Sequence, residues 1–321
     1  MGDTPLRLPR SLPMRHREEH NPSPVGFLVL DKPAGLSSHS CVSRVRRAYG
    51  LKRVGHGGTL DPAVTGVLPI ALGAATRLLP YLDGDKTYRG MVQLGLSTST
   101  DDLEGEVLVH TPLPADLDRH RVEAALAAFR GSINQVPPQI SAVHVDGVRA
   151  YQRARRGETV SLSARTVTVH RLTLLAYDQA RGQLELEVRC SAGTYIRALA
   201  RDLGTALGTG AALASLRRTQ ALGFGLAEAV GWQALDPQVL DAGAPLPPLL
   251  PPLVALAHLA QQQLSETELE GWRCGRQLQA QHGWPPGTPV VITTPAGALA
   301  GMASAIEGGS LQPKLVIDAA G

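Results

Sequence analysis

Apolar residues recur along this chain with two different periods, and the period predicts which segments are strands and which are helices. Continuous or alternating apolar runs predict strands at residues 26–30, 67–72, 87–94, 166–174, 183–188, 289–293 and 299–303. A repeat of three to four residues predicts helices at 39–49, 119–130, 148–156, 194–207 and 266–273, and a shorter one ending at Leu79. This mixture indicates a protein with both strands and helices, but it does not select one fold.

Two proline-rich segments divide the chain. Residues 1–24 are rich in Pro, Arg and polar residues and lack an apolar period, which predicts a disordered N-terminal tail. Five prolines lie among leucines between Pro245 and Pro252, and such a segment is typical of a domain boundary. We therefore expect a main domain at residues 25–248 and a small, mostly β domain at 249–321.

The glycine-rich stretch Arg53–Gly66 is unusual because it contains a single carboxylate. Asp61 is the only acid between Asp31 and Asp83. One acid among four glycines indicates a placed group that a ligand can approach closely. On local sequence alone, a simple turn opened by Asp61-Pro62 explains the pattern equally well.

The composition indicates the cellular compartment in which the protein works. Three widely spaced cysteines, Cys41, Cys190 and Cys274, predict reduced thiols and neither disulfides nor a zinc site. No segment resembles a signal peptide or a membrane span, so we expect a cytoplasmic protein with no membrane partner.

The net charge of +3 is modest, but the cations are clustered. The three clusters are Arg44, Arg46, Arg47, Lys52 and Arg53; Arg149, Arg153, Arg155 and Arg156; and Arg197, Arg201, Arg217 and Arg218. Such clusters match the electrostatic footprint of a phosphate backbone, although a solvated helix face would explain any one of them.

Several kinds of chemistry lack their motifs. The sequence contains no phosphate-loop, dinucleotide-binding or G-x-S-x-G pattern. Asp61 with Asp101 or Asp102 could form the carboxylate pair of a glycosidase, but the basic clusters do not suit a neutral sugar. The remaining kind of chemistry is that of a single carboxylate acting on a polyanion.

A series of motifs closely resembles the bacterial tRNA pseudouridine-55 synthase family, known as TruB. The motifs are Gly26–Ser38, Gly55–Pro62 with Thr65–Leu68, Lys86–Arg89, Thr98–Asp102, Pro137–Ala142 with Gly147, Tyr151 and Arg155, Cys190–Arg197, Asp202–Gly204 and Leu216–Arg218. They occur in the family's order over residues 25–220, so the resemblance is highly specific.

The resemblance implies a fold, a reaction and a partner. The fold is the pseudouridine-synthase α/β (α+β) fold, a mixed, largely antiparallel sheet with flanking helices, followed by a PUA-like RNA-binding domain. The reaction isomerises a uridine in the T-loop of tRNA by detaching the base from C1′ and rejoining it through C5. The implied protein grips the acceptor stem and needs no cofactor, metal or guide RNA. We expect a monomer.

Three residues match the family's catalytic positions. Asp61 matches the nucleophile, which forms a covalent intermediate through either C1′ of the ribose or C6 of the base. Tyr88 matches the tyrosine that packs on the target base and takes part in proton removal at C5. Arg197 matches the arginine that pairs with the aspartate.

Other matches border the substrate. His56 matches a histidine that helps to hold the flipped nucleotides, although a histidine after glycine is more often a structural hydrogen-bonding group. The remaining substrate-binding candidates are Lys32, Leu216, Tyr195 and Asp102. For Lys32 and Leu216 taken alone, phosphate contact or core packing is the default, and Asp102 could be a solvated loop acid.

The sequence departs from the family pattern at several positions. Gly57 stands where many relatives have Thr, Ala63-Val64 replaces a commoner Leu-Ala or Met-Ala, and His144 stands where Lys is usual. Two rival functions remain: the guide-RNA-dependent relatives of archaea and eukaryotes, and a non-catalytic RNA chaperone that has kept the fold.

Overall fold

The computed structural model describes residues 24–317 except 142–143, 146–147, 150–152 and 154–160. All of the predicted tail except Pro24 therefore lies outside the described residues. Within the described part, no helix is long and apolar enough to cross a membrane.

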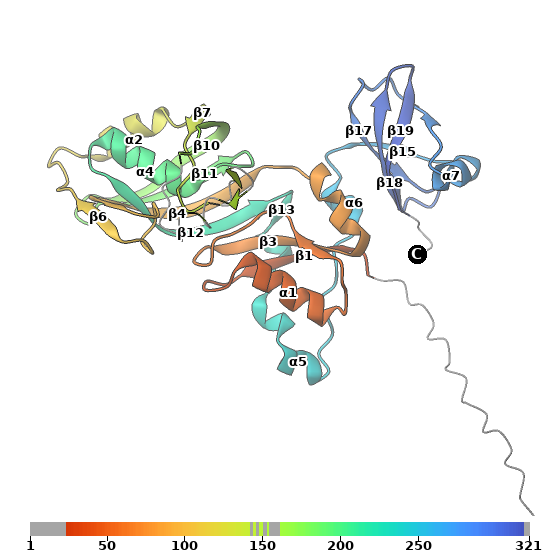
Figure 1. Ribbon diagram of the computed structural model, residues 1–321, viewed down its shortest axis with the longest axis horizontal. Helices are drawn as coiled ribbons and strands as arrows, with labels where there is room; N and C mark the ends of the chain where they lie inside the picture. The colour runs from red at the N-terminus through yellow and green to blue at the C-terminus, as the bar shows by residue number, and fades with distance from the viewer. Residues whose placement is uncertain (1–23, 142–143, 146–147, 150–152, 154–160, 318–321) are drawn as a thin grey trace, which may run out of the picture.

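A ten-stranded sheet forms the centre of the larger part of the molecule (Figure 1). Its order is β14-β1-β3-β12-β4-β11-β10-β7, with β2 on β3 and β13 on β12. The strands are β1 (Gly26–Lys32), β2 (Val54–His56), β3 (Thr65–Leu72), β4 (Lys86–Leu94), β7 (Gly131–Gln135), β10 (Arg165–Asp178), β11 (Gln183–Cys190), β12 (Ala211–Ala221), β13 (Phe224–Gly225) and β14 (Val230–Gly231). Only β1–β14 and β3–β12 pair in parallel, which confirms the expected mixed, largely antiparallel sheet.

Three helices pack on this sheet through one apolar cluster. They are α1 (Ser38–Ala48), α2 (Arg119–Ala127) and α4 (Ile196–Leu207). The Ser37 side chain caps α1 by accepting from the Ser40 amide, and Gly208 ends α4 in the left-handed conformation. The helices predicted at 39–49, 119–130 and 194–207 are therefore confirmed, apart from small differences at their ends.

The sequence pattern misses the strand at the centre of the sheet. β12 contains four alanines and three charged or hydroxyl residues in succession, Arg217-Arg218-Thr219, so its apolar positions do not alternate. It gains its place from pairing with β3 on one side and β4 on the other. Tertiary context decides this strand where local pattern cannot.

The parallel pairing of β3 with β12 requires a glycine. Gly66 lies opposite Arg218, and its φ of +101° suits a residue without a side chain. A Cβ atom at Gly66 would lie 2.1 Å from the carbonyl oxygen of Arg218. The glycine that ends the Arg53–Gly66 stretch thus permits close approach between two strands.

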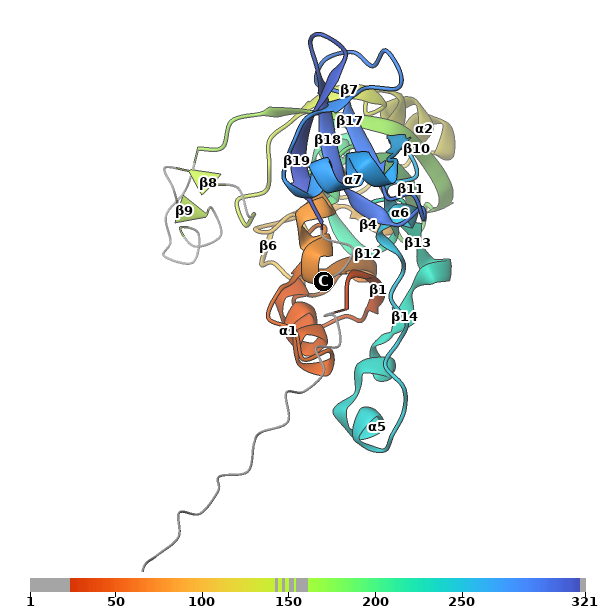
Figure 2. The same ribbon diagram turned by 90° about the vertical axis from the view of Figure 1, so that its right-hand side faces the viewer.

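Two smaller pairs of strands form separate two-stranded sheets. β5 (Leu96–Thr98) pairs with β6 (Val107–His110), and β8 (His144–Val145) pairs with β9 (Val148–Arg149) (Figure 2). The helix predicted at 148–156 is wrong for its first two residues, because strand pairing takes Val148 and Arg149. Most of its other residues lie outside the described part of the chain.

A five-stranded sheet occupies the C-terminal part (Figure 1). Its order is β15 (Ala260–Gln263), β17 (Pro289–Thr293), β18 (Leu299–Ile306), β19 (Ser310–Val316) and β16 (Leu278–Gln279). The buried Gln262 joins the two edge strands: its amide donates to the Gln279 carbonyl at 2.9 Å and its oxygen accepts from the Gln281 amide at 3.0 Å. Helix α7 (Glu266–Arg273) inserts the fully buried Trp272 into the core of this module.

The two parts share an apolar contact. Leu250 exchanges backbone hydrogen bonds with Phe27 on β1. The 3-10 helix η1 (Gly73–Tyr81) contributes Ala75 and Leu78 to a cluster that also contains Met302 and Leu315. The small module therefore packs, near the proline-rich segment, against the face of β1 and β3 opposite the one that α1 covers.

We predict that Trp272→Ala destabilises the folded protein by about 3–5 kcal/mol, because it leaves a cavity and removes the indole donor. In the folded protein that donor, Nε1, binds the Ala300 carbonyl at 2.8 Å. Denaturant unfolding measures the change. Val254→Ala, at a side chain that is 56% exposed, is the control and should change stability by less than about 0.5 kcal/mol. Equal effects of the two substitutions would contradict the central role of this ring.

Candidate active site

A cavity of about 290 Å³ lies beside β4 and β12 and collects most of the predicted site residues. Its lining includes Asp61, Tyr88, Tyr195, Arg197 and Leu216. A second hollow of about 110 Å³ shares Asp61, Arg197 and Leu216 and adds Asp102. Six of the eight predicted residues therefore meet at one place, although they come from five separate segments of the sequence.

Asp61 lies in the loop between β2 and β3, and the chain holds this loop from beneath. The Ser38 hydroxyl binds both backbone groups of Leu60, at 2.8 and 3.0 Å. The Val64 amide donates to the Asp61 carbonyl at 3.1 Å, so Asp61 does open a turn. Its side chain is 46% exposed, so the same turn presents the carboxylate to the cavity.

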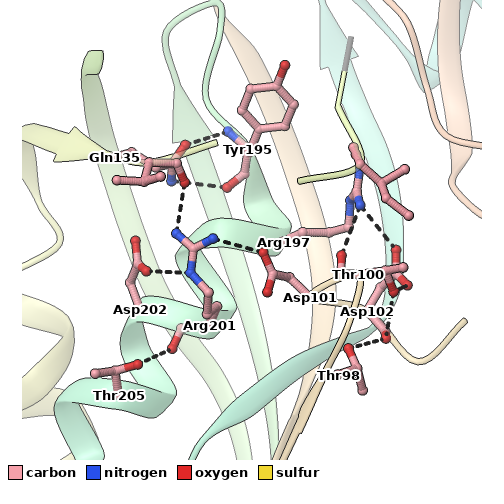
Figure 3. A network of polar contacts seen from close by, with 12 residues as sticks. Thr98, Thr100, Asp101, Asp102, Gln135, Tyr195, Arg197, Arg201, Asp202 and Thr205 are labelled. Carbon is pink, nitrogen blue, oxygen red and sulfur yellow. Dashed lines mark hydrogen bonds and ion pairs between the residues drawn. The ribbon is translucent and has the colours of Figure 1, made fainter. Parts of the chain in front are cut away.

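Arg197 connects this carboxylate to the opposite wall. Its Nη2 lies 3.0 Å from Asp61 Oδ2 and also donates to the Ile140 carbonyl at 2.9 Å. Its Nη1 donates to the Thr100 carbonyl at 2.9 Å and lies 3.6 Å from Asp102 Oδ2 (Figure 3). The guanidinium is almost fully buried, so these contacts replace the water that it has lost.

Asp102 is held in turn by its own loop. Its side chain accepts from the Thr100 hydroxyl and, at 3.1 Å, from the Glu104 amide. It contacts Arg197 at the border of the second hollow and is not a freely solvated loop acid.

A second arginine on α4 fixes the neighbouring loop (Figure 3). Arg201 donates to Asp101 at 2.9 Å, to Asp202 at 2.8 Å and to the Val136 carbonyl at 2.8 Å. Asp101 has a φ of +63°, which is unusual for a residue other than glycine. Burial raises the pKa of Asp101, and Arg201 acts against this rise.

The third predicted phosphate-binding cluster is therefore corrected. Arg197 and Arg201 bind protein acceptors, Arg217 makes a two-point ion pair with Asp31, and Arg218 is fully buried. The fold thus gives each of these arginines a partner or a buried place inside the protein. Arg197 and Arg218 are therefore too buried to meet RNA phosphates, whereas the Arg217 side chain stays 41% exposed beside its partner Asp31.

Two predicted residues do not line the cavity. Lys32 is fully buried, and its Nζ donates to the carbonyls of Pro33, Leu36 and Pro62 at 2.7–2.9 Å. It therefore holds the loop that carries Asp61 and cannot contact a phosphate, which corrects its assignment as substrate-binding. Burial lowers the pKa of Lys32, whereas nearby Asp61 raises it.

His56 is half-buried behind the cavity, at the end of β2. Its Nδ1 accepts from the Gly58 amide at 3.2 Å, as a structural histidine would. Burial, together with Arg218, lowers the pKa of His56 and so favours the neutral ring. The stacking role in holding flipped nucleotides stays a prediction.

Sequence reasoning missed two cations at the cavity. Lys86 lines it, with Nζ donating to the Gly84 carbonyl at 2.9 Å. Arg218 lies under its floor and donates to the Gly58 carbonyl at 3.1 Å. Both belong to matched motifs, but only the register of β4 and β12 shows that they flank Tyr88.

The Gly57 departure has a steric explanation. A Cβ atom at this position would lie 1.9 Å from Cδ1 of Leu222. Leu222 has a φ of +57° and fills the space that a larger residue at position 57 would need. The side chain of His144, the other departure of interest, lies outside the part that the structure describes.

Family models match most of the main domain. Residues 46–196 match the N-terminal domain of the TruB family of pseudouridylate synthases, and residues 197–256 match the tRNA pseudouridylate synthase B C-terminal domain. A protein of Parasynechococcus marenigrum called tRNA pseudouridine synthase B is 62% identical over 93% of this chain and 99% of its own length. The chain belongs to the TruB family.

Other relatives agree with this TruB assignment. The tRNA pseudouridine synthase B of Gloeobacter violaceus is 48% identical over 91% of this chain and 98% of its own length. Among solved structures, an H/ACA RNP bound to a substrate RNA has a TM-score of 0.69 at 25% identity, covering 91% of this chain and 84% of that one. A Cbf5-Nop10-Gar1 complex has a TM-score of 0.68 at 26% identity, with the same coverage.

The boundary between the two TruB models does not separate the site. Asp61 and Tyr88 fall in the first model, whereas Arg197 and Leu216 fall in the second. The second model also contains β12, the strand at the centre of the main sheet. Both regions therefore contribute to one sheet and one cavity.

We predict that Lys32→Met lowers the rate of pseudouridine formation about 100-fold while RNA affinity is unchanged. The substitution leaves three carbonyls without their donor and loosens the Asp61 loop, and small misplacements of a reacting group cost about this much. Single-turnover rates and RNA-binding assays separate the two effects. Lys52→Met, at an exposed cation, is the comparison and should weaken binding with the rate retained. Loss of binding by Lys32→Met alone would contradict the loop-holding role.

Proposed function

We propose that this TruB protein isomerises uridine-55 in the T-loop of tRNA to pseudouridine, with Asp61 as the nucleophile. The observation that carries the proposal is an accessible carboxylate in a cavity, held at 3.0 Å by a buried arginine and flanked by Tyr88. The relatives that match over nearly their full length are called tRNA pseudouridine synthase B, which supports tRNA as the substrate.

The geometry suits a covalent intermediate. A carboxylate can attack C1′ of the ribose or C6 of the base and can leave again, so it divides one difficult step into two easier ones. Among the described residues Asp61 has one side-chain ion pair, with Arg197 Nη2, which leaves its other carboxylate oxygen available to a substrate. Arg197 orients the nucleophile. Its hydrogen bonds to the Thr100 and Ile140 carbonyls fix the position of the guanidinium itself.

The cavity suits one extruded base. A volume of about 290 Å³ is near the lower end for small-molecule sites, so it could receive a single nucleotide but not a stacked loop. The target uridine would therefore have to be flipped out of the T-loop. Tyr88, Tyr195 and Leu216 supply flat and apolar walls for it.

The grip on tRNA should come mainly from the catalytic domain. Residues 249–321 contain three Lys/Arg and five Asp/Glu, so the positive charge lies in the rest of the chain. Lys52, Arg53 and Arg77 are exposed, and no ion-pair partner is found for them among the described residues. The Gly73 amide donates to the Arg53 carbonyl, so the segments that carry Arg53 and Arg77 lie side by side. In this proposal the PUA-like module contacts the acceptor stem with little electrostatic contribution.

Two rival functions are disfavoured. The solved neighbours include H/ACA complexes, which supports the guide-RNA-dependent rival only at the level of the fold and 25–26% identity. Identity of 62% to a tRNA pseudouridine synthase B favours a protein that works without a guide. The complete set of Asp61, Tyr88 and Arg197 around one cavity argues against a purely non-catalytic chaperone.

We predict that Asp61→Asn lowers pseudouridine formation at position 55 by at least about 10⁴-fold, as loss of a catalytic nucleophile does. The purified protein is incubated with unmodified transcript tRNA and no guide RNA, and the modified position is mapped. Asp116→Asn, at an exposed acid far along the chain, is the matched control and should retain full activity. Equal product from Asp61→Asn and wild type would overturn the nucleophile. Product at another uridine would overturn the position.

We also predict that Arg53→Gln combined with Arg77→Gln reduces the salt dependence of tRNA binding. Each lost phosphate contact should lower the slope of log affinity against log salt by about 0.7–0.9. The control combines Arg276→Gln and Lys314→Gln, two exposed cations of the C-terminal module, and should change the slope by less. The reverse order of the two double variants would assign the electrostatic grip to the C-terminal module.

A further inference from the structure

Arg218 occupies the row of the sheet that passes beneath the cavity. On β12 it lies directly across from Tyr88 on β4 and from Gly66 on β3. It is 0% exposed, whereas its neighbour Arg217 points to the other face and pairs with Asp31. A completely buried guanidinium is costly unless protein acceptors replace the water that it has lost.

Two of its three nitrogens have backbone partners. Nε donates to the Val67 carbonyl at 2.7 Å, and Nη2 donates to the Gly58 carbonyl at 3.1 Å. Nη1 is buried and lacks a hydrogen bond of ordinary geometry to any described residue. The guanidinium therefore holds the loop at Gly58, three residues before Asp61, and its Nη1 is left without such a partner.

Tyr88 is the acidic side chain that this cation faces, and burial together with Arg218 also lowers the pKa of three basic groups around it, Lys32, His56 and Lys86. Its ring is buried, and the two side chains interact. Burial raises the pKa of Tyr88, and Arg218 is the largest influence that lowers it again. The other charged or titratable groups around Tyr88 and its cavity are Cys190 on β11, Asp61 in the loop before β3, Lys86 on β4, and Tyr195 and Arg197 at the start of α4. Cys190 and Asp61 disfavour a charge on Tyr88, so Arg218 opposes them.

A phenol can accept a proton from carbon only after its own proton has left. If Tyr88 removes the proton from C5, its oxygen must therefore carry negative charge in a site that excludes water. A buried negative oxygen needs a nearby cation. Lys86 lines the same cavity but is not among the groups that shift the pKa of Tyr88, whereas Arg218 lies across from Tyr88 in the strand register and its Nη1 has no ordinary hydrogen bond to a described residue.

We propose that Arg218 is a positioning residue that stabilises the phenolate of Tyr88 and thereby allows Tyr88 to take the proton from C5. This inference rests on the proposed function. In the step itself, after C5 has bonded to C1′, the C5–H bond breaks, the proton moves to the phenolate oxygen, and the electron pair forms the C5–C6 double bond. At C6 the displaced pair moves onto N1 or, where Asp61 has added to C6, leaves with the carboxylate oxygen as the C6–O bond breaks. N1, which has lost its bond to C1′, gains one proton, so the isomerisation consumes none overall.

The test is the pH dependence of single-turnover pseudouridine formation by full-length Arg218→Met. Loss of the cation should raise the pH of half-maximal rate by about 1–3 units, the size of a neighbouring charge's effect. The rate at neutral pH should fall about 10- to 1000-fold and recover as the pH rises. Arg218→Lys, which keeps a charge, should lie between this variant and wild type. Arg217→Met should leave the profile unchanged.

A purely structural role would give another result. If Arg218 only holds the Gly58 loop, Arg218→Met lowers the rate equally at every pH, and the inference is overturned. Failure of the proposed function looks different, because wild-type protein would then form no pseudouridine at position 55.

A second measurement leaves Arg218 in place and so does not depend on how its variants fold. A ring-fluorinated tyrosine at position 88 has a more acidic phenol and should move the wild-type profile to lower pH. An unmoved profile would show that ionisation of Tyr88 does not control the rate, which also overturns the inference.

Discussion

The buried guanidinium of Arg197 is the constraint on which the site depends. A cation that has lost nearly all contact with water must find protein acceptors, and those of Arg197 come from three other segments: the Asp61 loop, the loop after β5 and the segment after β7. The same contacts that satisfy the charge therefore set the distance between the walls of the cavity. Because α4 is packed on the sheet through Leu199 and Leu203, the arginine is presented from a rigid element and holds Asp61 in place.

The floor of the site depends on a second close arrangement, where β3, β12 and β4 lie side by side. Gly66 allows the backbone of β12 to approach, and this places Arg218 between the Asp61 loop and Tyr88. Lys32 and Ser38 hold the same loop from below. Several buried polar groups thus serve one short loop, and each is satisfied mainly by backbone atoms. Such a network fixes the position of a carboxylate without shielding it from a substrate.

The sequence predicted the elements with clear apolar periods, among them β4, β10, β11 and α4, and it identified Asp61 by its isolation among glycines. The resemblance to TruB then supplied Tyr88 and Arg197, which no local pattern distinguishes. β12 was missed because its alanines and arginines do not alternate and only its neighbours make it a strand. Lys32 and the arginines of the third cluster were misjudged for a related reason: a charge pattern along a chain does not show which carbonyls and carboxylates the fold will bring to it. Arg218 could be understood only from strand register.

In the proposed reaction the cavity lined by Asp61 and Arg197 receives a uridine extruded from the tRNA. The most direct test is a crystal structure of Asp61→Asn bound to a tRNA T-arm, because the substitution keeps the shape of the side chain and removes its nucleophilicity. We predict a single nucleotide inside the cavity, in contact with residue 61, Tyr88 and Leu216, and its C1′ or C6 atom nearest to residue 61 would identify the attacked position. A uridine that stays stacked in the T-loop, or RNA bound to a different face of the sheet, would contradict the account.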